Sequence, residues 1–393
     1  MSAVGWIVGS LQERDAALEL LRGEGEAEPR DELGIGLLRD AIAEAFFPGV
    51  TTLQTRAKYF LLVPSMYQEI ENTRSRVPAA RRIRELEVEL LERLRGTGER
   101  GIIGSQRWRV PQNPSSGIYW SGLYTWRIRL FRNTRAHYHR WLDGGRRLPL
   151  ASSGDDATAA DARWYEPPES AGLLDEAHLR LQRNHAEFLR DRILGIRDRP
   201  DRSLLKDFVA GGPFPDGVMF WQLPAARGAA LAELARDAER LATALNGAML
   251  LYNRRCAELA DAAMVPLWRE RLHQWSADHP ATSWREWNLD AFWERVQRLD
   301  GGHARSWTEP FLAPWVAELR TRGPETSAAL RLVVGREQAV KPGRARTAGA
   351  ASLDTWKPDS GVAAAPLTFR WPEARTILND IHAGLTSASH AAS

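Results

Sequence analysis

The stretch RDELGIGLLRDAIAEAFFPG, residues 30–49, predicts the fold class of the chain. Its charged start passes through a Gly-Ile-Gly hinge into an apolar repeat. The apolar residues follow a three- and four-residue spacing, which is typical of one face of an α-helix. They are Leu38, Ala41, Ile42, Ala45 and Phe46. We therefore expect a helix over Leu37–Phe47, which Pro48 and Gly49 end.

Similar patterns recur along the chain. The clearest helix is expected between Pro78 and Gly96, where alternating charges lie opposite an apolar stripe. Residues 101–114 are expected to form a loop or a short hairpin, and alternating strand patterns are almost absent elsewhere. Further helices are expected at 51–67 with a kink at Pro64, at 115–142, 173–196, 203–209, 225–263, within 265–319, and between Pro372 and Gly384. The sequence thus predicts a mainly α, multi-helical fold.

A segment poor in apolar residues divides the chain. It contains GGRR, ASSGDDATAADA and EPPES, a composition that cannot order itself by burying apolar surface. Since 393 residues exceed what one compact core normally takes, we predict two lobes joined by a disordered or loop linker. The N-terminal helical domain is expected at 1–142, the linker at 143–170 and the C-terminal helical domain at 171–393. The second domain is expected to carry a basic loop near 335–366.

The composition, 44% hydrophobic and 26% charged, is typical of a globular protein. The apolar runs are too short to span a bilayer, and the start MSAVGWIVGS lacks a secretory signal pattern. We therefore expect a cytoplasmic protein without membrane contact. Cys256 is the only cysteine, which excludes an intramolecular disulfide and a cysteine-rich zinc site. Nearly all basic residues are arginine, whose planar group suits phosphate contacts and aromatic stacking.

The segment RDELGIG allows three interpretations. Gly34 and Gly36 could let backbone N–H groups bind a phosphate, although no GxGxxG or Walker pattern and no strand accompany them. Asp31 and Glu32 could be the carboxylates of a metal or acid–base site, although no PD…(D/E)xK nuclease pattern occurs nearby. We favour the third interpretation, in which the acids cap and charge the start of the following helix and pair with a nearby arginine.

The segment QTRAKYFLLVP places polar residues on the first turns of an apolar helix. Helical spacing turns Arg56 towards buried surface, where an unpaired charge costs roughly 3–5 kcal/mol. Its partner is expected among Asp31, Glu32 and Asp40. We predict one structural ion-pair cluster of Arg30, Asp31, Glu32 and Arg56 between two packed helices. The alternative is that these residues form the floor of a binding site.

Residues 107–147 carry the strongest functional signal, because arginines alternate with aromatic residues around a single acid, Asp143. A basic track with aromatic platforms is typical of proteins that hold a nucleic-acid backbone and stack exposed bases. The predicted nucleic-acid-binding residues are Arg107, Arg109, Trp120, Trp126, Arg127, Arg129, Arg132 and Arg135. The alternative is an amphipathic segment whose aromatic residues are core and whose arginines form a solvated face.

Other chemistry finds little support in the sequence. His137 and His139 point apart on a helix and have no evident third ligand, so no metal site is expected. No cofactor is predicted, and the GxSxG pattern of serine hydrolases is absent. Cys256 lies inside a long expected helix, where a buried, inert thiol is expected rather than a nucleophile.

Three blocks of sequence together resemble an uncharacterised bacterial family, a domain of unknown function, over nearly the whole chain. They are RDELGIGLLRDAIAEAFFPGVTTLQTRAKYFLLVP, PSSGIYWSGLYTW and FRWPEARTILNDIHAGL. The resemblance brings no activity and no catalytic residue. It implies a gene neighbourhood of bacterial anti-phage defence and DNA-processing genes, near helicases and nucleases.

Two hypotheses follow. The first is a non-catalytic subunit that binds nucleic acid, DNA rather than RNA, through residues 107–147 and docks to a helicase or nuclease partner. The second is a metal-dependent nuclease or other phosphodiester hydrolase with Asp31, Glu32 and Asp40 as its carboxylates and Arg56 as its phosphate clamp. A protein–protein scaffold that uses the tryptophan-rich residues 265–315 is a third, plainer option.

Overall fold

Every regular element of the described chain is a helix, and its one extended contact is an isolated bridge between Arg129 and Trp164. The predicted mainly α fold is therefore confirmed. None of these helices is long and apolar enough to cross a lipid bilayer. Most of the predicted linker lies outside the described residues. The computed structural model describes residues 31–73, 77–144, 163–165, 172–176, 178–197, 203–227, 231–260, 263–300, 302–349, 353, 356 and 365–387.

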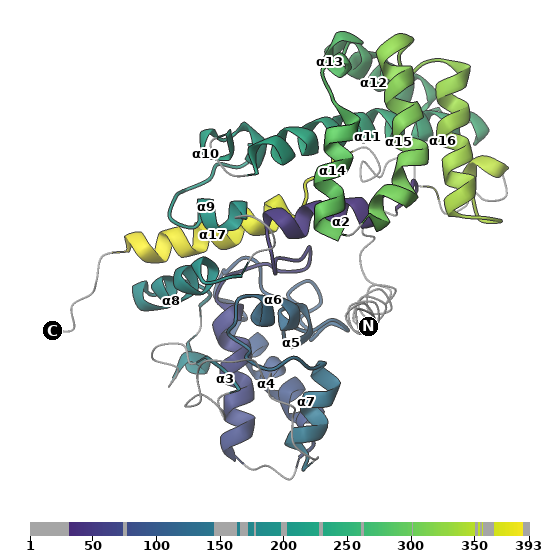
Figure 1. Cartoon of the computed structure of the whole chain (residues 1–393). Helices are drawn as coiled ribbons and strands as arrows, with labels where there is room; N and C mark the ends of the chain where they lie inside the picture. The colour runs from purple at the N-terminus through teal and green to yellow at the C-terminus, as the bar shows by residue number, and fades with distance from the viewer. Residues whose placement is uncertain are drawn as a thin grey trace, which may run out of the picture.

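The helices of the first part of the chain form the lower lobe in Figure 1. The helix α4 buries the predicted stripe of Ile83, Leu86, Leu90 and Leu94, and it packs against α3 and α7. Pro64 lies inside α3, as the sequence predicts. The bounds are α3 Tyr59–Thr73, α4 Ala79–Leu94, α5 Ser115–Ile118, α6 Trp120–Thr125 and α7 Arg135–Leu142.

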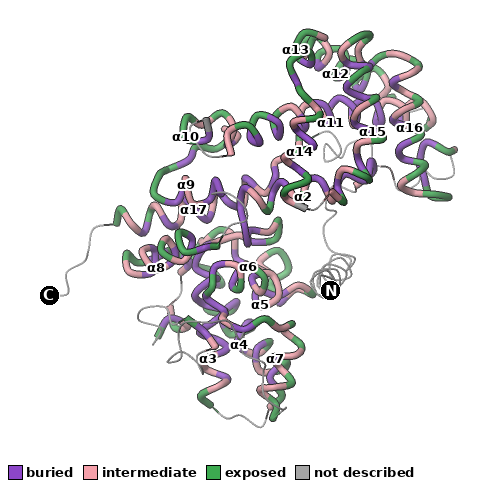
Figure 2. The backbone as a smooth tube through the Cα atoms, in the orientation of Figure 1, coloured by how far each residue is buried: buried purple, intermediate pink, exposed green. Residues whose placement is uncertain are grey.

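The upper lobe is built around the long helix α11, Ala232–Leu259, which packs against α12, α14 and α16. Figure 2 shows buried segments along these helices, and many of the buried side chains are tryptophan. The fully or nearly buried ones are Trp268, Trp275, Trp284, Trp287, Trp293 and Trp315. The other bounds are α10 Pro224–Arg227, α12 Val265–Asp278, α13 Thr282–Arg285, α14 Leu289–Asp300, α15 His303–Thr321 and α16 Ser327–Val340.

Three helices from distant parts of the sequence lie between the lobes (Figure 1). They are α2 Gly36–Phe46, α9 Leu204–Phe208 and α17 Trp371–Thr386. Although α2 belongs to the first predicted domain, it packs against α14 and α15 of the second. The division into domains at 143–170 stays a prediction. The helix α17 packs along α8, Arg183–Leu194, and short 3₁₀ turns complete the fold at Leu173–Asp175, Phe220–Gln222 and Arg346–Ala348.

The helix expected from residue 51 begins only at Tyr59, because side chains bind the backbone before it. The Tyr119 hydroxyl accepts from the N–H groups of Thr55 and Arg56, at 2.9 and 3.1 Å. A carboxylate oxygen of Asp380 accepts from the N–H of Ala57 at 2.9 Å. These bonds bind backbone N–H groups that a helix from residue 51 would need for its own i to i−4 hydrogen bonds.

Three further expectations were wrong. The helix expected at 173–196 is a 3₁₀ turn followed by α8. Residues 335–340 end α16 instead of starting the basic loop, much of which lies outside the described residues. Gly384 lies inside α17 instead of ending it. A Cβ atom at Gly384 would be 2.7 Å from the Cβ of Ala186, so the glycine allows the close approach of α17 to α8.

The acids of RDELGIG lie at the entry of the chain into the upper lobe. Asp31 caps the start of α2, since its carboxylate accepts from the N–H groups of Ile35 and Gly36 at 2.7 and 2.6 Å. Glu32 is buried and pairs with Arg346 at 2.8 Å and with Lys341. Arg30 lies outside the described residues. The two acids thus have separate tasks, one at the helix start and one in a buried cluster.

The buried cluster around Glu32 joins four segments. The Tyr252 hydroxyl of α11 donates to the carboxylate of Glu337 at 2.9 Å and lies 3.4 Å from that of Glu32. The same Glu337 carboxylate accepts from the N–H of Arg346 and from the N–H and hydroxyl of Thr347. Each buried carboxylate therefore has several donors, which is what its burial requires.

A second buried arginine fastens the Gly-Ile-Gly hinge. Arg336 of α16 donates to the carbonyl oxygens of Leu33 and Gly34 at 2.7 and 3.0 Å. The Trp307 indole donates to the same Gly34 carbonyl at 2.6 Å. Gly34 has a φ of 61°, and a Cβ there would be 2.6 Å from a methyl group of Val340. Glycine at this position is thus required by both backbone and space.

Arg56 takes other partners than those expected, which corrects the prediction of a single cluster with Asp31 and Glu32. Its guanidinium pairs with Asp380 of α17 at 2.9 Å and with Glu99 at 3.3 Å. The neighbouring Lys58 is fully buried and pairs with Glu176. These pairs connect the start of α3 to the last helix and to the segment before α8, and Glu32 has no part in them.

Replacing Glu32 by alanine is expected to lower the free energy of unfolding by about 3–5 kcal/mol, because Arg346 and Lys341 lose a carboxylate in a buried site. Chemical denaturation measures the change. Asp40→Ala is the matched control, since Asp40 is exposed and pairs with Arg39 at the surface; its cost is expected to be about 0–1 kcal/mol. Equal effects of the two substitutions would contradict a structural role of the buried cluster.

Candidate nucleic-acid interface

Two of the predicted base-stacking residues pack inside the lower lobe. Trp126 has no exposed surface, stacks on Phe60 with ring centroids 3.8 Å apart and donates to the carbonyl of Pro48. Trp120 is partly buried and donates to the carbonyl of Asn133 at 3.0 Å. The prediction that Trp126 stacks on nucleic-acid bases is therefore wrong, because its ring already has a partner in the core.

Arg129 is also buried. Its guanidinium donates to the carbonyl oxygens of Trp120, Phe131 and Asn133 and lies 4.4 Å from the Trp120 ring centroid. This arginine holds the turn after α6 together, so it is not part of a contact surface. Arg135 is half-buried and donates to the Ser116 hydroxyl at 2.6 Å. The middle of the predicted track is thus structural.

Four of the six arginines predicted to bind nucleic acid are exposed: Arg107, Arg109, Arg127 and Arg132. Arg127 directly follows the buried Trp126 and has a φ of 55°, which turns the chain at the end of α6. Arg107 and Arg109 lie in the loop between α4 and α5. No other described residue forms an ion pair with Arg107 or Arg109, so both charges face solvent.

The loop that carries Arg107 and Arg109 has a defined conformation. Buried Ile102 and Val110 anchor its two ends. The N–H of Arg109 donates to the carbonyl of Gly104 at 3.2 Å, and Gly104 has a φ of 92°. A Cβ at Gly104 would be 2.6 Å from the Arg109 carbonyl oxygen, so this turn requires glycine.

Trp108 lies at the tip of this loop and is 36% exposed. Its φ is 45°, a left-handed value that is rare for a bulky side chain and is often found at functional sites. Arg95, at the end of α4, lies over the indole with 5.1 Å between its guanidinium carbon and the ring centroid. We call Arg95, Arg107, Trp108 and Arg109 the Arg–Trp patch.

The electrostatics of this region are one-sided. No aspartate or glutamate occurs between Arg100 and Leu142. Arg95 has an acidic neighbour, Glu92, at 3.3 Å on the same helix, where both side chains are exposed and the pair is weak. The Arg–Trp patch is therefore a positively charged surface with an aromatic ring at its centre.

The sequence predicted Arg107 and Arg109 as contact residues; it counted Trp108 only among the aromatic residues of the 107–147 segment and did not point to Arg95. The available signal was the segment GTGERGIIGSQRWRV, residues 96–110, in which glycines indicate turns and RWR interrupts any helical pattern. A tryptophan in such a loop has less chance of burial than one on a helix face.

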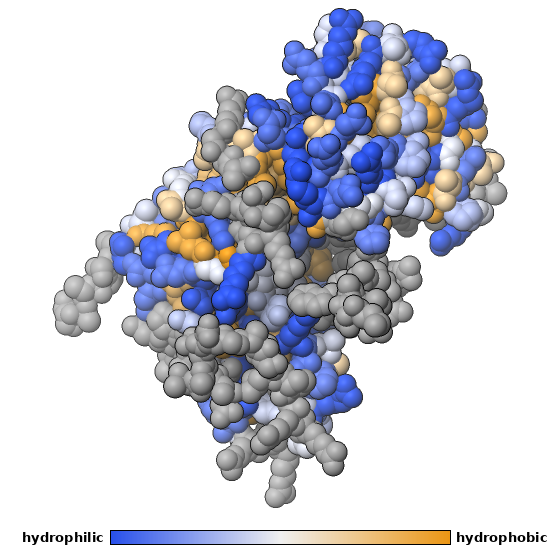
Figure 3. All heavy atoms as spheres, in the orientation of Figure 1, coloured by the Kyte–Doolittle hydropathy of each residue, from blue (hydrophilic) through white to orange (hydrophobic). Residues whose placement is uncertain are grey.

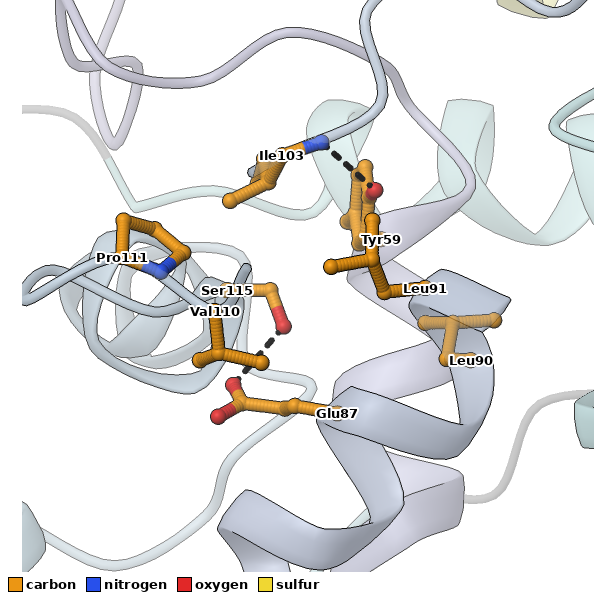
Figure 4. Close-up of a pocket in the computed structure, with 8 residues that line it drawn as sticks. All are labelled: Tyr59, Glu87, Leu90, Leu91, Ile103, Val110, Pro111 and Ser115. Atoms are coloured by element: carbon orange, nitrogen blue, oxygen red, sulfur yellow. Dashed lines mark hydrogen bonds between the residues drawn. The ribbon is translucent and has the colours of Figure 1, made fainter. Parts of the chain in front are cut away.

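A pocket of about 250 Å³, counting its open mouth, lies behind this loop (Figure 4). It is lined by Glu87, Leu90 and Leu91 of α4, by Tyr59, and by residues from the loop and from α5. Glu87 is buried and accepts from the Ser115 hydroxyl and the Ser116 N–H at 2.9 and 2.8 Å. Burial raises the pKa of the Glu87 carboxyl above its ordinary value.

The residues proposed for a nuclease do not form a common site. Asp31 caps α2, Glu32 is paired inside the upper lobe, and Asp40 pairs with Arg39 at the surface. Within the described ranges, no group of three or more His, Cys, Asp or Glu residues is arranged to hold a metal ion. Burial raises the pKa of the Cys256 thiol to about 12, so this thiol stays protonated at neutral pH.

Glu87→Gln is expected to change how stability depends on pH. The folded pKa lies above the ordinary 4.5, so Glu87 contributes stability below pH 4.5 that is lost as the pH rises through the folded value. The free energy of unfolding of the native protein, relative to the variant, should fall as the pH rises from 4.5 through the folded pKa. The fall is about 1.4 kcal/mol for each unit by which burial raises the pKa.

Denaturation series across this pH range measure the effect. Glu89→Gln is the control, because Glu89 is exposed on the same helix; its effect should stay within about 0.5 kcal/mol. A relative stability that rises with pH would show that the hydrogen bonds from Ser115 and Ser116 outweigh the cost of burying the Glu87 charge.

Comparison with known proteins identifies the family but no activity. No curated protein and no solved structure matches the chain. One family profile matches residues 1–384, nearly the full length. This match confirms the resemblance to an uncharacterised family, while the expected gene neighbourhood stays a prediction. The chain belongs to the family of unknown function DUF6361.

Proposed function

We propose that this protein binds nucleic acid, DNA rather than RNA, through the Arg–Trp patch and acts as a non-catalytic subunit in the cytoplasm. The observation that carries the proposal is the loop at 102–110. It displays Arg107 and Arg109 next to an exposed tryptophan, in a segment, residues 101–142, that contains no aspartate or glutamate. Guanidinium groups form paired hydrogen bonds with phosphate oxygens, so this surface fits a nucleic-acid backbone.

The lower lobe offers further phosphate contacts. Arg127 and Arg132 are exposed in the same lobe, and we expect them to extend the contact beyond the patch. Over the upper lobe, the face of the molecule drawn in Figure 3 carries hydrophilic side chains with hydrophobic ones between them. Arg129, although part of the same sequence track, supports this surface from within.

That the protein works with a helicase or nuclease partner is proposed from the family resemblance alone. A helicase or nuclease in a bacterial defence or DNA-processing complex would supply the chemistry, and this chain would hold the nucleic acid for it. A nuclease activity of the chain itself has no support in the geometry, since its candidate carboxylates serve capping and ion pairing.

The double variant Arg107→Glu/Arg109→Glu is expected to lose most of its nucleic-acid affinity, because two phosphate contacts become repulsive. The native affinity should fall steeply with salt, and the slope of log K against log salt should become smaller by about 1 per lost contact. Fluorescence anisotropy titrations of labelled DNA and RNA at several salt concentrations measure both quantities.

The matched control is Arg269→Glu/Arg285→Glu, which makes the same change of net charge at two exposed positions of the upper lobe. Its affinity should stay near that of the native protein, and both double variants should keep the native melting temperature. Equal losses in the two variants would indicate a response to net charge alone. Absence of native binding at low salt would refute the proposal.

A further inference from the structure

We infer that Trp108 stacks on an unpaired base, so that the Arg–Trp patch recognises single-stranded nucleic acid in preference to duplex. This inference deepens the proposed function and rests on it. Charge alone attracts any nucleic acid to the patch, whereas an exposed aromatic ring selects strands with unpaired bases.

The first observation is that Trp108 has no role in the core. Among the tryptophans with a described side chain, only Trp108 and Trp307 count as exposed. Trp307 has a structural task, because its indole N–H donates to Gly34 and Arg336 lies over its ring. For Trp108, the one aromatic or cationic neighbour in the described chain is Arg95. Its ring is thus available to a ligand.

The second observation is that the loop holds Trp108 outward at a conformational cost. The left-handed φ of 45° is unfavourable for tryptophan, and a glycine or asparagine would adopt it more easily. The Gly104 turn and the buried anchors Ile102 and Val110 fix the loop in this form. An aromatic side chain that is preorganised at the surface loses little entropy when it binds.

The third observation is the arrangement of charges around the ring. Arg107 and Arg109 flank Trp108 along the chain, so they are placed to contact the phosphates on either side of a stacked base. Arg95 lies over the indole, 5.1 Å from its centroid, and a base would stack on the exposed part of the ring. A planar ring between cationic groups is the arrangement by which proteins bind single strands without sequence preference.

This arrangement discriminates against duplex because paired bases already stack on each other. A duplex presents only its phosphates to the patch, so Arg107 and Arg109 contribute to binding and Trp108 does not. An unpaired base offers a free aromatic face as well. The contribution of the ring should therefore appear only with a single strand.

The test compares native protein, Trp108→Ala and Trp108→Phe in titrations with oligo(dT), oligo(U) and a long, fully paired, blunt-ended DNA duplex. Trp108→Ala should weaken single-strand binding by about 5- to 150-fold, the effect of losing one stacked base. Trp108→Phe should keep most of the affinity, and duplex binding should hardly change. Tyr165→Ala is the control, because Tyr165 is also exposed beneath an arginine, Arg192, at 3.8 Å.

A second measurement keeps the test independent of folding. Oligo(dT) that carries 5-iodouracil should crosslink to Trp108 of the native protein under ultraviolet light, which peptide mass spectrometry can locate. One result would overturn the inference while leaving the proposed function intact. In that result, native protein binds oligo(dT) and the arginine double variant does not, but Trp108→Ala binds as tightly as native protein and no crosslink maps to the loop. Equal losses for single strand and duplex would also overturn it. If the native protein binds none of the three probes, the proposed function itself fails.

Discussion

The segment that leads into α2 is held in the upper lobe by one buried ion pair, that of Glu32 with Arg346. Burying these charges is costly, and the cost is offset only because Tyr252, Lys341 and Glu337 complete their hydrogen bonds. Arg336 adds direct bonds to the backbone of the adjoining hinge. With these residues fixed, α2 packs against α14 and α15, and α3 follows it into the lower lobe.

The sequence predicted the helices well where the information is local. The spacing of apolar residues, together with the proline and glycine residues that mark helix ends, predicted the bounds of α2 and α4 to within two residues. Predictions failed where distant groups decide the structure. The start of α3 depends on Tyr119 and on Asp380, which lies 323 residues beyond the backbone N–H it accepts from. The partners of Arg56 could not be found from nearby acids for the same reason.

The candidate site shows a similar limit. Alternation of arginine with aromatic residues correctly indicated a region with an unusual composition, but composition does not distinguish a core from a surface. Trp126 stacks on Phe60 and Arg129 donates to the Phe131 carbonyl, so both have their partners inside the lobe. The sequence shows the glycines of the loop that carries Trp108, but the exposed position of this ring follows from the Gly104 turn in the structure. Only the three-dimensional packing therefore shows which arginines and aromatic residues of this region are buried.

The helix α17 closes the structure late in the chain and contacts its earliest described parts. Asp380 pairs with Arg56, and Arg370 pairs with Glu44 at 2.8 Å. During synthesis the ribosome makes residues 56 and 99 long before residue 380, so Arg56 emerges without its main carboxylate partner. Contacts of such sequence separation slow folding. The ion pair that ties the start of α3 to α17 can therefore form only after nearly all of the chain has left the ribosome, whereas the pair with Glu99 can form much earlier.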